Sequence, residues 1–315
     1  MNRTKLSEKD GADGARVVHN PSMARWRAPL LSGRSVGGRV LTDADVPDAL
    51  RVCAQVPVDS VLAAARVATA AEVGLRRAGG VLWGYERDDE LIAVCWSGAN
   101  LVPVVPPGAE EAIGAFARLA RSASRRSSSI VGERSAVLAL WEQLADHWPA
   151  PREIRADQPS LVMDSEPLAA IDPAVRRTHP DEYEAVLPAC IAMFTEEVGY
   201  SPASGPSGPY EVRVRHLIEQ GRSFARFDGD PPHVLFKAEV GALACGVAQV
   251  QGVWVRPDRR GEGLAVAGMA AVVQHVRRTM APTVSLYVND YNAPALAAYH
   301  RVGFRQVGTY ATILF

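Results

Sequence analysis

The sequence predicts a mixed α/β fold built from two halves of similar plan. The chain has 315 residues, which is enough for two domains of ordinary size. Two late segments, 250–255 and 284–288, alternate apolar and other residues as half-buried strands do, and a helical stretch follows each of them. The order of strands and helices expected before residue 165 also resembles the order expected after residue 175.

The first domain is expected over residues 38–165, after a polar segment at 1–37 that we expect to be disordered. Its hairpin is indicated by two apolar runs that flank the acidic turn at 86–90. The expected elements are a strand at 38–41, a helix at 43–56, hairpin strands at 80–85 and 91–98, a strand at 101–105, a helix ending at 121, a strand at 129–132, a helix at 135–144 and a strand at 161–164.

A segment with prolines near both ends, 165–173, reads as a linker to the second domain at 175–315. That domain has about 140 residues, an ordinary domain size. The expected elements are a helix from 181, a loop at 201–209, a helix from 210, the strand at 250–255, a helix at 264–278, the strand at 284–288 and a short helix from 292 that ends at Gly303.

The turn Arg260–Ala265, with the sequence Arg-Gly-Glu-Gly-Leu-Ala, joins a strand to a helix and is suited to hold an anion. Glycine lets the backbone approach a ligand closely, and the first N–H groups of a helix have no partner inside the helix. Phosphate oxygens can satisfy those groups. The sequence lacks the Gly-Lys-Ser/Thr of a P-loop and the third glycine of a dinucleotide turn. The turn fits the pattern R-x-x-G-x-A and resembles that of the GNAT acetyltransferases.

That resemblance implies acetyl-CoA as co-substrate, with its pyrophosphate held by the turn. The residues implied in the turn are Arg260, Gly261, Glu262, Gly263, Leu264 and Ala265. It further implies that the strand carrying Val253, Trp254 and Val255 pairs its backbone with the pantetheine arm. A backbone N–H there, which we assign to Val253 or Val255, would face the acetyl carbonyl oxygen.

A second motif follows at the expected distance, since Asn292, Ala295 and Tyr299 recur along one face of a helix. In the GNAT family, the Asn contacts pantetheine, and the Tyr lies near the thioester sulfur, where its hydroxyl can protonate the leaving thiolate. Without the resemblance, Tyr299 reads as a core aromatic and Asn292 as the N-cap of the helix. Capping and pantetheine contact are compatible.

The general base is the role for which the sequence leaves alternatives. The strand 250–255 has no Asp, Glu or His. Three carboxylates are candidates: Glu239 on the preceding strand, and Glu196 and Glu197 in a segment expected over the substrate groove. His216 and His233 are weaker candidates, because a single histidine is more often structural.

The first half lacks the anion-binding turn. Where the pattern would fall, the sequence reads Pro107-Gly-Ala-Glu-Glu111, which places two carboxylates at the start of a helix. Such charges suit the helix dipole and repel a pyrophosphate. We therefore expect two tandem GNAT-like domains, of which the first is degenerate and binds no CoA.

Taken whole, the chain resembles actinobacterial acetyltransferases in which a domain of unknown function precedes a GNAT domain. The residues that carry this resemblance are Met193–Gly199, Phe236–Gly241, Gln249–Val255 and Ser285–Asp290.

The composition argues against several classes of binding partner. Lys and Arg number 34 against 35 Asp and Glu, so no overall basic field favours nucleic acid. No apolar run reaches the ~18 residues of a membrane helix, and no signal peptide is evident. The four cysteines are scattered without metal-ligand spacing, which predicts no metal site and reduced thiols in a cytoplasmic protein. Homodimerisation is left open.

The expected activity is acetyl-CoA-dependent N-acetylation of a small-molecule or peptide amine. One alternative is a non-catalytic acyl-CoA-binding regulator, which the absence of an obvious base favours. Another is a tRNA-dependent aminoacyl transferase with two GNAT-like domains, against which the intact turn and the near-neutral charge argue.

Overall fold

A computed structural model of the chain describes residues 37–123, 125–202 and 208–315. Apart from Gly37, the segment that we expected to be disordered lies outside the described residues, as does part of the loop expected at 201–209.

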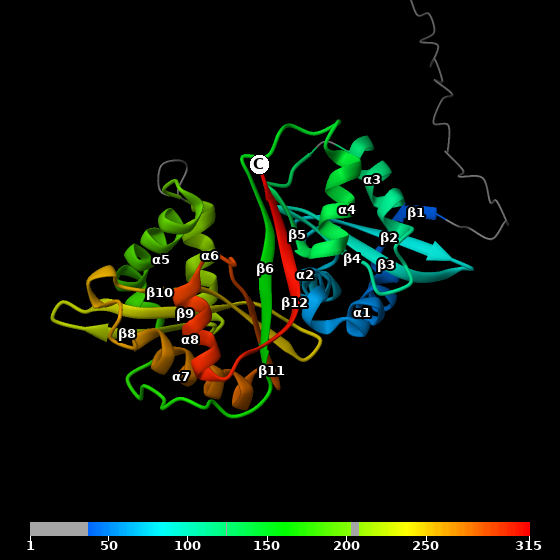
Figure 1. The fold of residues 1–315 in the computed structure, drawn as a ribbon. Coiled ribbons are helices and arrows are strands. Elements are labelled where there is room, and N and C mark those ends of the chain that lie inside the picture. Colours follow the sequence, from blue (N-terminus) through cyan, green and yellow to red (C-terminus); the bar gives the residue numbers. More distant parts are fainter. Residues whose placement is uncertain (1–36, 124, 203–207) are drawn as a thin grey trace, which may run out of the picture. The chain divides into compact units, whose positions relative to one another are not determined.

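A twelve-stranded mixed sheet organises the described chain (Figure 1). Its strand order is β1-β2-β3-β4-β5-β12-β6-β11-β10-β9-β8-β7. The strands are β1 (Gly37–Val40), β2 (Val81–Arg87), β3 (Glu90–Ser97), β4 (Asn100–Val104), β5 (Ser129–Glu133), β6 (Glu153–Met163), β7 (Arg176–Arg177), β8 (Ser223–Asp228), β9 (His233–Ala244), β10 (Val247–Val255), β11 (Thr283–Tyr287) and β12 (Arg305–Leu314).

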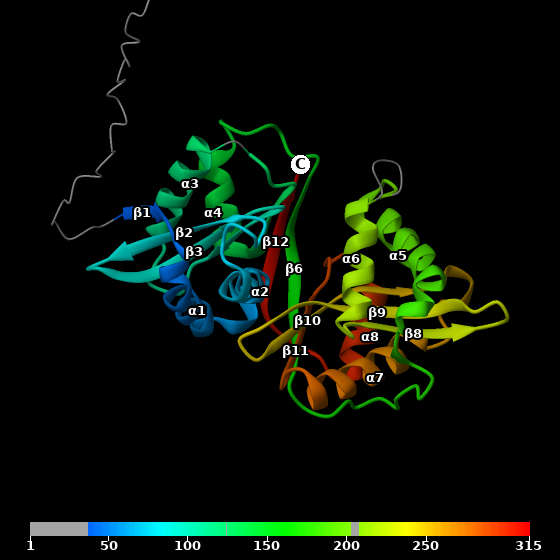
Figure 2. The same cartoon turned by 180° about the vertical axis from the view of Figure 1, so that it is seen from behind.

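Helices cover both faces of the sheet. Figure 2 shows α5 and α6 over one face of β8, β9 and β10, while α7 and α8 lie on the other face, as Figure 1 shows. The helices are α1 (Val46–Gln55), α2 (Pro57–Val73), α3 (Ala112–Ser122), α4 (Arg134–Leu144), α5 (Tyr183–Val198), α6 (Gly208–Glu219), α7 (Leu264–Thr279) and α8 (Ala293–Val302). The mixed α/β class expected from the sequence is confirmed.

The two halves exchange strands at the centre of the sheet. Strand β6 precedes the linker, yet it pairs with β11 of the second half, and the final strand β12 lies between β6 and β5 (Figure 1). The cores follow the exchange, because Leu161 and Met163 of β6 pack with the core under α7, whereas Ala311 and Ile313 of β12 pack with α3 and α4. A boundary at residues 165–175 therefore separates strands that are hydrogen-bonded neighbours.

Helix α2 joins the halves, and no local sequence pattern predicts it. Its side chains Ala63, Ala64 and Val67 pack in the first-half core, while Val61 packs against Ala242 and Val247 of the β9–β10 hairpin. A helix that is buried on more than one side lacks the clear apolar stripe by which amphipathic helices are recognised. Its Ala- and Val-rich sequence therefore gave no periodic signal.

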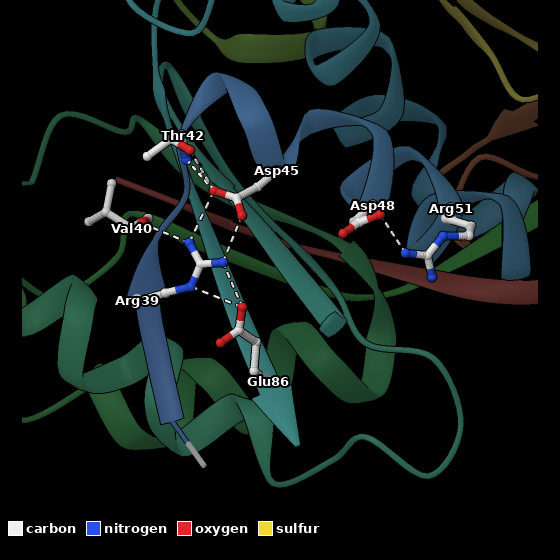
Figure 3. A network of polar contacts seen from close by, with 7 residues as sticks. All are labelled: Arg39, Val40, Thr42, Asp45, Asp48, Arg51 and Glu86. Carbon is white, nitrogen blue, oxygen red and sulfur yellow. Dashed lines mark hydrogen bonds and ion pairs between the residues drawn. The ribbon is translucent and has the colours of Figure 1, made fainter. Parts of the chain in front are cut away.

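Ion pairs of a single arginine, Arg39, hold the edge of the first half together. The Arg39 guanidinium donates to Asp45 at 2.7 and 3.0 Å and to Glu86 at 2.6 and 2.9 Å, and so links β1, the short 3-10 turn Asp43–Asp45 and β2 (Figure 3). The hydrogen bonds from Arg39 hold the pKa of Asp45 well below its usual range.

Candidate active site

The turn before α7 presents unpaired backbone donors. Strand β10 ends at Val255, the 3-10 turn Pro257–Arg259 follows, and α7 begins at Leu264. Gly261 and Gly263 adopt φ values of 86° and 83°, a left-handed conformation that favours glycine. Among the described residues, no backbone N–H from 261 to 265 donates to a protein acceptor. The structure thus has the free amides at a helix start that bind anionic groups.

An ion pair neutralises the acidic side chain of this turn, so the turn can still accept an anion. Arg259 donates to both carboxylate oxygens of Glu262 at 2.8 and 2.9 Å, and this contact lowers the pKa of Glu262. The negative charge of Glu262 is therefore matched locally. The Arg260 guanidinium donates to the Val255 carbonyl at 3.1 Å and to Glu196 at 2.6 Å.

Strands β10 and β11 separate beside the turn. They pair in parallel only at Val247–Gln249 with Thr283–Ser285. Beyond that point β11 remains paired with β6, through Leu286 and Tyr287, while residues 250–255 of β10 pair only with β9. One backbone edge of β10 is thus left open toward β11, in a form that an extended ligand can pair with.

A β-bulge shapes the open strand at Gly252. The register with β9 shifts between Gln251 and Trp254, and Gly252 has a φ of 57°. A Cβ at Gly252 would lie 3.0 Å from Lys237 Nζ and 3.1 Å from Glu239 Cδ. Glycine is required both by the backbone conformation and by this close approach of buried charged groups.

Those buried charges are Lys237 and Glu239 on β9. Lys237 is fully buried and donates to Glu239 at 3.2 Å and to the Gly252 carbonyl at 3.1 Å. Arg213 of α6 donates to the other Glu239 oxygen at 3.2 Å. Burial raises the pKa of Glu239, but Lys237 and Arg213 outweigh it, so the pKa lies below its usual range. Glu239 is therefore an ionised group that binds two cations.

Tyr299 lies on the inner face of α8, as the sequence predicts. Its ring packs edge-to-face against Phe304, and the residue is 7% exposed. Its hydroxyl forms no hydrogen bond with the described part of the chain. Burial and, after it, the charge of Glu197 raise the pKa of Tyr299 above its usual range. The phenol consequently stays protonated and can donate.

The side chain of Asn292 caps α8, because its Oδ1 accepts a hydrogen bond from the Ala295 N–H at 3.2 Å. The N-cap role expected from the sequence is confirmed, and Asn292 is exposed enough for a further ligand contact.

The two neighbouring glutamates at the end of α5 point to different partners. Glu196 accepts from the Trp254 indole at 3.1 Å and from Arg260, which ties it to the strand and the turn. Glu197 forms one long ion pair, 3.4 Å, with Arg155 of β6. Burial raises the pKa of both Tyr287 and Tyr299, and the nearby charge of Glu197 raises both further. Of the weaker candidates, His216 lies on the outside of α6 and His233 at the start of β9, and both are exposed.

The turn of the first half contains its own carboxylate. Glu110 Oε1 accepts from the Gly108 N–H at 2.9 Å, and Glu111 pairs with Arg87 at 2.8 Å. A protein carboxylate thus takes up a backbone donor at this turn.

Sequence reasoning did not single out Lys237 and Arg213, the two cationic partners of Glu239. A lysine and a glutamate two residues apart in an otherwise apolar strand were the available signal for the first of them, because charged residues on a buried face are paired or functional. Nothing in the local sequence of α6 indicates that Arg213 contacts Glu239.

Further structural findings concern metals, thiols and membranes. Within the described ranges, no group of three or more His, Cys, Asp or Glu side chains is placed to hold a metal ion. All four cysteines are free, and three of them are buried. None of the helices in the described ranges has the length and apolarity needed to cross a bilayer.

Comparison with known proteins identifies two domains by sequence. Residues 80–186 match a domain of unknown function, DUF4081, and residues 224–304 match the acetyltransferase (GNAT) family. A curated relative, the mycothiol acetyltransferase of Saccharomonospora viridis, is 43% identical over 63 residues. That match spans 20% of this chain and 21% of the relative.

Solved structures share the fold at low sequence identity. A GNAT-family acetyltransferase from Colwellia psychrerythraea matches with a TM-score of 0.54 and 14% identity, covering 88% of this chain and 99% of that one. A Drosophila protein matches with a TM-score of 0.61 and 12% identity, covering 89% and 99%. A tandem GNAT protein from the clavulanic acid biosynthesis pathway matches with 0.51 and 15%, covering 89% and 98%. These matches support two GNAT-like halves in one chain.

Proposed function

We propose that this chain, a GNAT-family protein in which a DUF4081 domain precedes the GNAT domain, transfers the acetyl group of acetyl-CoA to the amine of a small molecule or a peptide. One observation carries the proposal: the backbone edge that β10 leaves open toward β11 lies next to the turn with free amides. An extended ligand with a pyrophosphate at one end matches both features.

In this proposal the pantetheine arm pairs with residues 250–255 of β10, and the N–H of Val253 or Val255 donates to the acetyl carbonyl oxygen. That oxygen gains negative charge when the amine attacks, so a fixed donor stabilises the transition state. Asn292 contacts the pantetheine arm from the start of α8. The turn residues Arg260–Ala265 bind the pyrophosphate.

Tyr299 acts as the general acid in this proposal. The amine nitrogen forms a bond to the carbonyl carbon, and the C–S bond then breaks. The Tyr299 hydroxyl donates its proton to the departing sulfur, a step that its raised pKa allows because the phenol is protonated at neutral pH.

Glu197 is the carboxylate that the geometry favours as the general base. It accepts a proton from the attacking amine, directly or through a water molecule. Glu239 is engaged by two cations and only 7% exposed, while Glu196 is engaged by Arg260 and Trp254. Glu197 has one long ion pair and lies near the Tyr299 phenol.

A second candidate function is acyl-CoA binding without transfer. It is favoured by one observation, that all three candidate carboxylates have cationic partners. The two functions differ in a direct assay, because a regulator binds acetyl-CoA yet acetylates no amine in a panel.

The test is calorimetric titration with acetyl-CoA and CoA. Wild type is compared with Gly263→Trp, whose side chain would cover the amides of the turn. The first half offers a matched control in Gly108→Trp, since Gly108 also has a left-handed φ, 87°, with open space at its Cβ position. We expect binding in wild type and in Gly108→Trp and its loss in Gly263→Trp. Absence of binding in wild type, or equal loss in both variants, would overturn the proposed CoA site.

A further inference from the structure

A group of largely buried polar side chains lies on the sheet face beneath α5 and α6, next to the bulge. Glu239 and Gln251 are directly paired across β9 and β10, and Gln249 accepts from the Gln251 amide at 3.2 Å. The intervening β9 residues Phe236, Ala238 and Val240 pack instead in the core under α7. The α5 side of the open strand is thus the polar side, where an acceptor would approach the acetyl group.

Positive charge exceeds negative charge among these side chains and Arg213. Lys237 and Arg213 share the single carboxylate of Glu239, which leaves one positive charge without a counter-charge. The Arg213 contacts are long, 3.2 Å to Glu239 and 3.4 Å to Gln251, and its side chain is 39% exposed. Arg213 therefore retains donors that an incoming ligand can use.

A second arginine, Arg66 of α2, lies near Arg213. Helix α2 packs on the β9–β10 hairpin through Val61 and Ala65, and Arg66 follows directly. Partial burial and, after it, the nearby Arg213 guanidinium lower the pKa of Arg66. Arg66 forms no ion pair or hydrogen bond with any part of the chain that the structure describes. The charges of Arg66 and Arg213 therefore lie close enough to repel each other, and of the two only Arg213 has a carboxylate partner among the described residues, Glu239.

We propose that the acceptor is an amine that also carries a carboxylate, as an amino acid or a peptide with a free C-terminus does, and that this carboxylate binds between Arg213 of α6 and Arg66 of α2. Guanidinium groups suit this partner because their planar donors match the two carboxylate oxygens. The inference rests on the proposed acetyl transfer and names its substrate class.

The binding mode gives the first half a part in substrate recognition. The carboxylate end is held by α2 and α6, and the amine extends past Gln251 toward the bulge at Gly252 and the base Glu197. An amine without an acidic group would leave Arg66 without a counter-charge and Arg213 with only its share of the Glu239 carboxylate. The selectivity arises where the halves meet, and it requires no CoA site in the first half.

The first test is binding to the CoA-loaded protein, which is independent of turnover. Dipeptides with a free C-terminus are titrated by calorimetry in parallel with their C-terminal amides, and free amino acids and phosphoethanolamine form two further arms. We expect the free acids to bind at least about tenfold more tightly than the amides, as expected for a charge-assisted contact. Equal binding of acids and amides, no binding of any acid, or tightest binding of phosphoethanolamine would overturn the proposal.

The second test uses variants in acetyl-transfer kinetics. Arg66→Gln should raise KM for acid-bearing amines by about 10- to 100-fold with little change in kcat or in CoA affinity. Arg66→Lys should restore part of the affinity because it keeps the charge. The control is Arg76→Gln, an exposed arginine just after α2, which should change nothing.

These outcomes separate the two proposals. If amines are acetylated but acids and amides are used equally, or if Arg66→Gln changes both classes alike, the substrate class is wrong and the acetyltransferase function stands. If CoA binds, acids bind its complex selectively and no acetyl group is transferred, the acceptor site stands and the proposed catalysis fails.

Discussion

The guanidinium of Arg260 lies 2.6 Å from the carboxylate of Glu196, from Nη2 to Oε2, and thereby ties the turn before α7 to the last turn of α5. The same carboxylate accepts from the Trp254 indole at 3.1 Å. Glu196 therefore connects the proposed pyrophosphate site, the open strand and the helix over the acceptor side. A ligand that binds the turn would compete with Glu196 for Arg260.

We predict that Glu196→Gln leaves folding nearly unchanged and does not weaken acetyl-CoA binding. Both partners of the ion pair are about half exposed, 50% and 45%, and exposed pairs contribute about 0–1 kcal/mol. Loss of the pair frees Arg260 for phosphate. Arg260→Gln should instead raise the Kd for acetyl-CoA by about tenfold, since it removes a charge-assisted contact. Denaturant unfolding and calorimetry check both expectations.

Glutamine variants of the three candidate glutamates test which of them is the general base. We expect Glu197→Gln to lower kcat by about 10²-fold or more, while Glu196→Gln stays within a few-fold of wild type, because only the base contributes proton transfer in the transition state. Initial rates with saturating acetyl-CoA provide the measurement. If Glu197→Gln keeps its activity while Glu196→Gln or Glu239→Gln loses it, the general base is the glutamate whose variant is inactive.

Tyr299→Phe should lower kcat by about 10²-fold without changing the Kd for CoA, since the ring that packs on Phe304 is kept and only the proton donor is removed. The raised pKa of Tyr299 also predicts a pH profile without an alkaline limb from this group below about pH 10, the ordinary tyrosine pKa. An unchanged kcat in the variant would exclude Tyr299 as the acid.

Gly252→Ala should destabilise the protein more than Gly261→Ala does. Both positions have left-handed φ values, so each substitution costs roughly 1–2 kcal/mol from the backbone. A Cβ at Gly261 has open space, whereas at Gly252 it would crowd Lys237, Glu239 and Met193 at 3.0–3.1 Å. Urea unfolding of the two variants isolates the packing contribution. Equal losses of unfolding free energy in the two variants would show that the side chains around Gly252 move aside at no energetic cost.

The contribution of Arg39 to stability should depend on pH. The folded-state pKa of Asp45 is depressed by the Arg39 hydrogen bonds, so this stabilisation is full above the unfolded-state value of about 3.9 and is lost as pH falls through the folded-state pKa. Arg39→Gln should cost about 1 kcal/mol at pH 7, a small value because Arg39 is 41% exposed, and the difference from wild type should shrink below pH 4.

A neighbouring pair on α1 serves as the control for that measurement. Arg51 and Asp48, also drawn in Figure 3, are 56% and 54% exposed, and Arg51→Gln should have almost no effect at either pH. If Arg39→Gln loses the same unfolding free energy at pH 7 and at pH 3, then Arg39 stabilises the protein by packing rather than by its ion pairs.

Local signals in the sequence identified most elements. The hairpin of β2 and β3, the helices α3, α4 and α7 and the strand β11 fall within a few residues of the predicted ranges. Helix α2 was missed because it is buried on more than one side, and the long β6 was predicted only at its apolar end, Leu161–Asp164. The polar first part of β6 pairs with β12, a partner about 150 residues away that no local pattern reveals.

The sequence by itself determined the chemistry of contiguous residues. The glycines at 261 and 263, the N-cap Asn292 and the helical spacing to Tyr299 are dictated by backbone conformation and periodicity over a few residues, so they can be read directly. Only the tertiary structure decided the exchange of β6 and β12, the separation of β10 from β11 and the ion pair of Arg213 with Glu239. Those features depend on strand register and on packing between segments far apart in the chain, where buried area and charge pairing, not local preference, set the outcome.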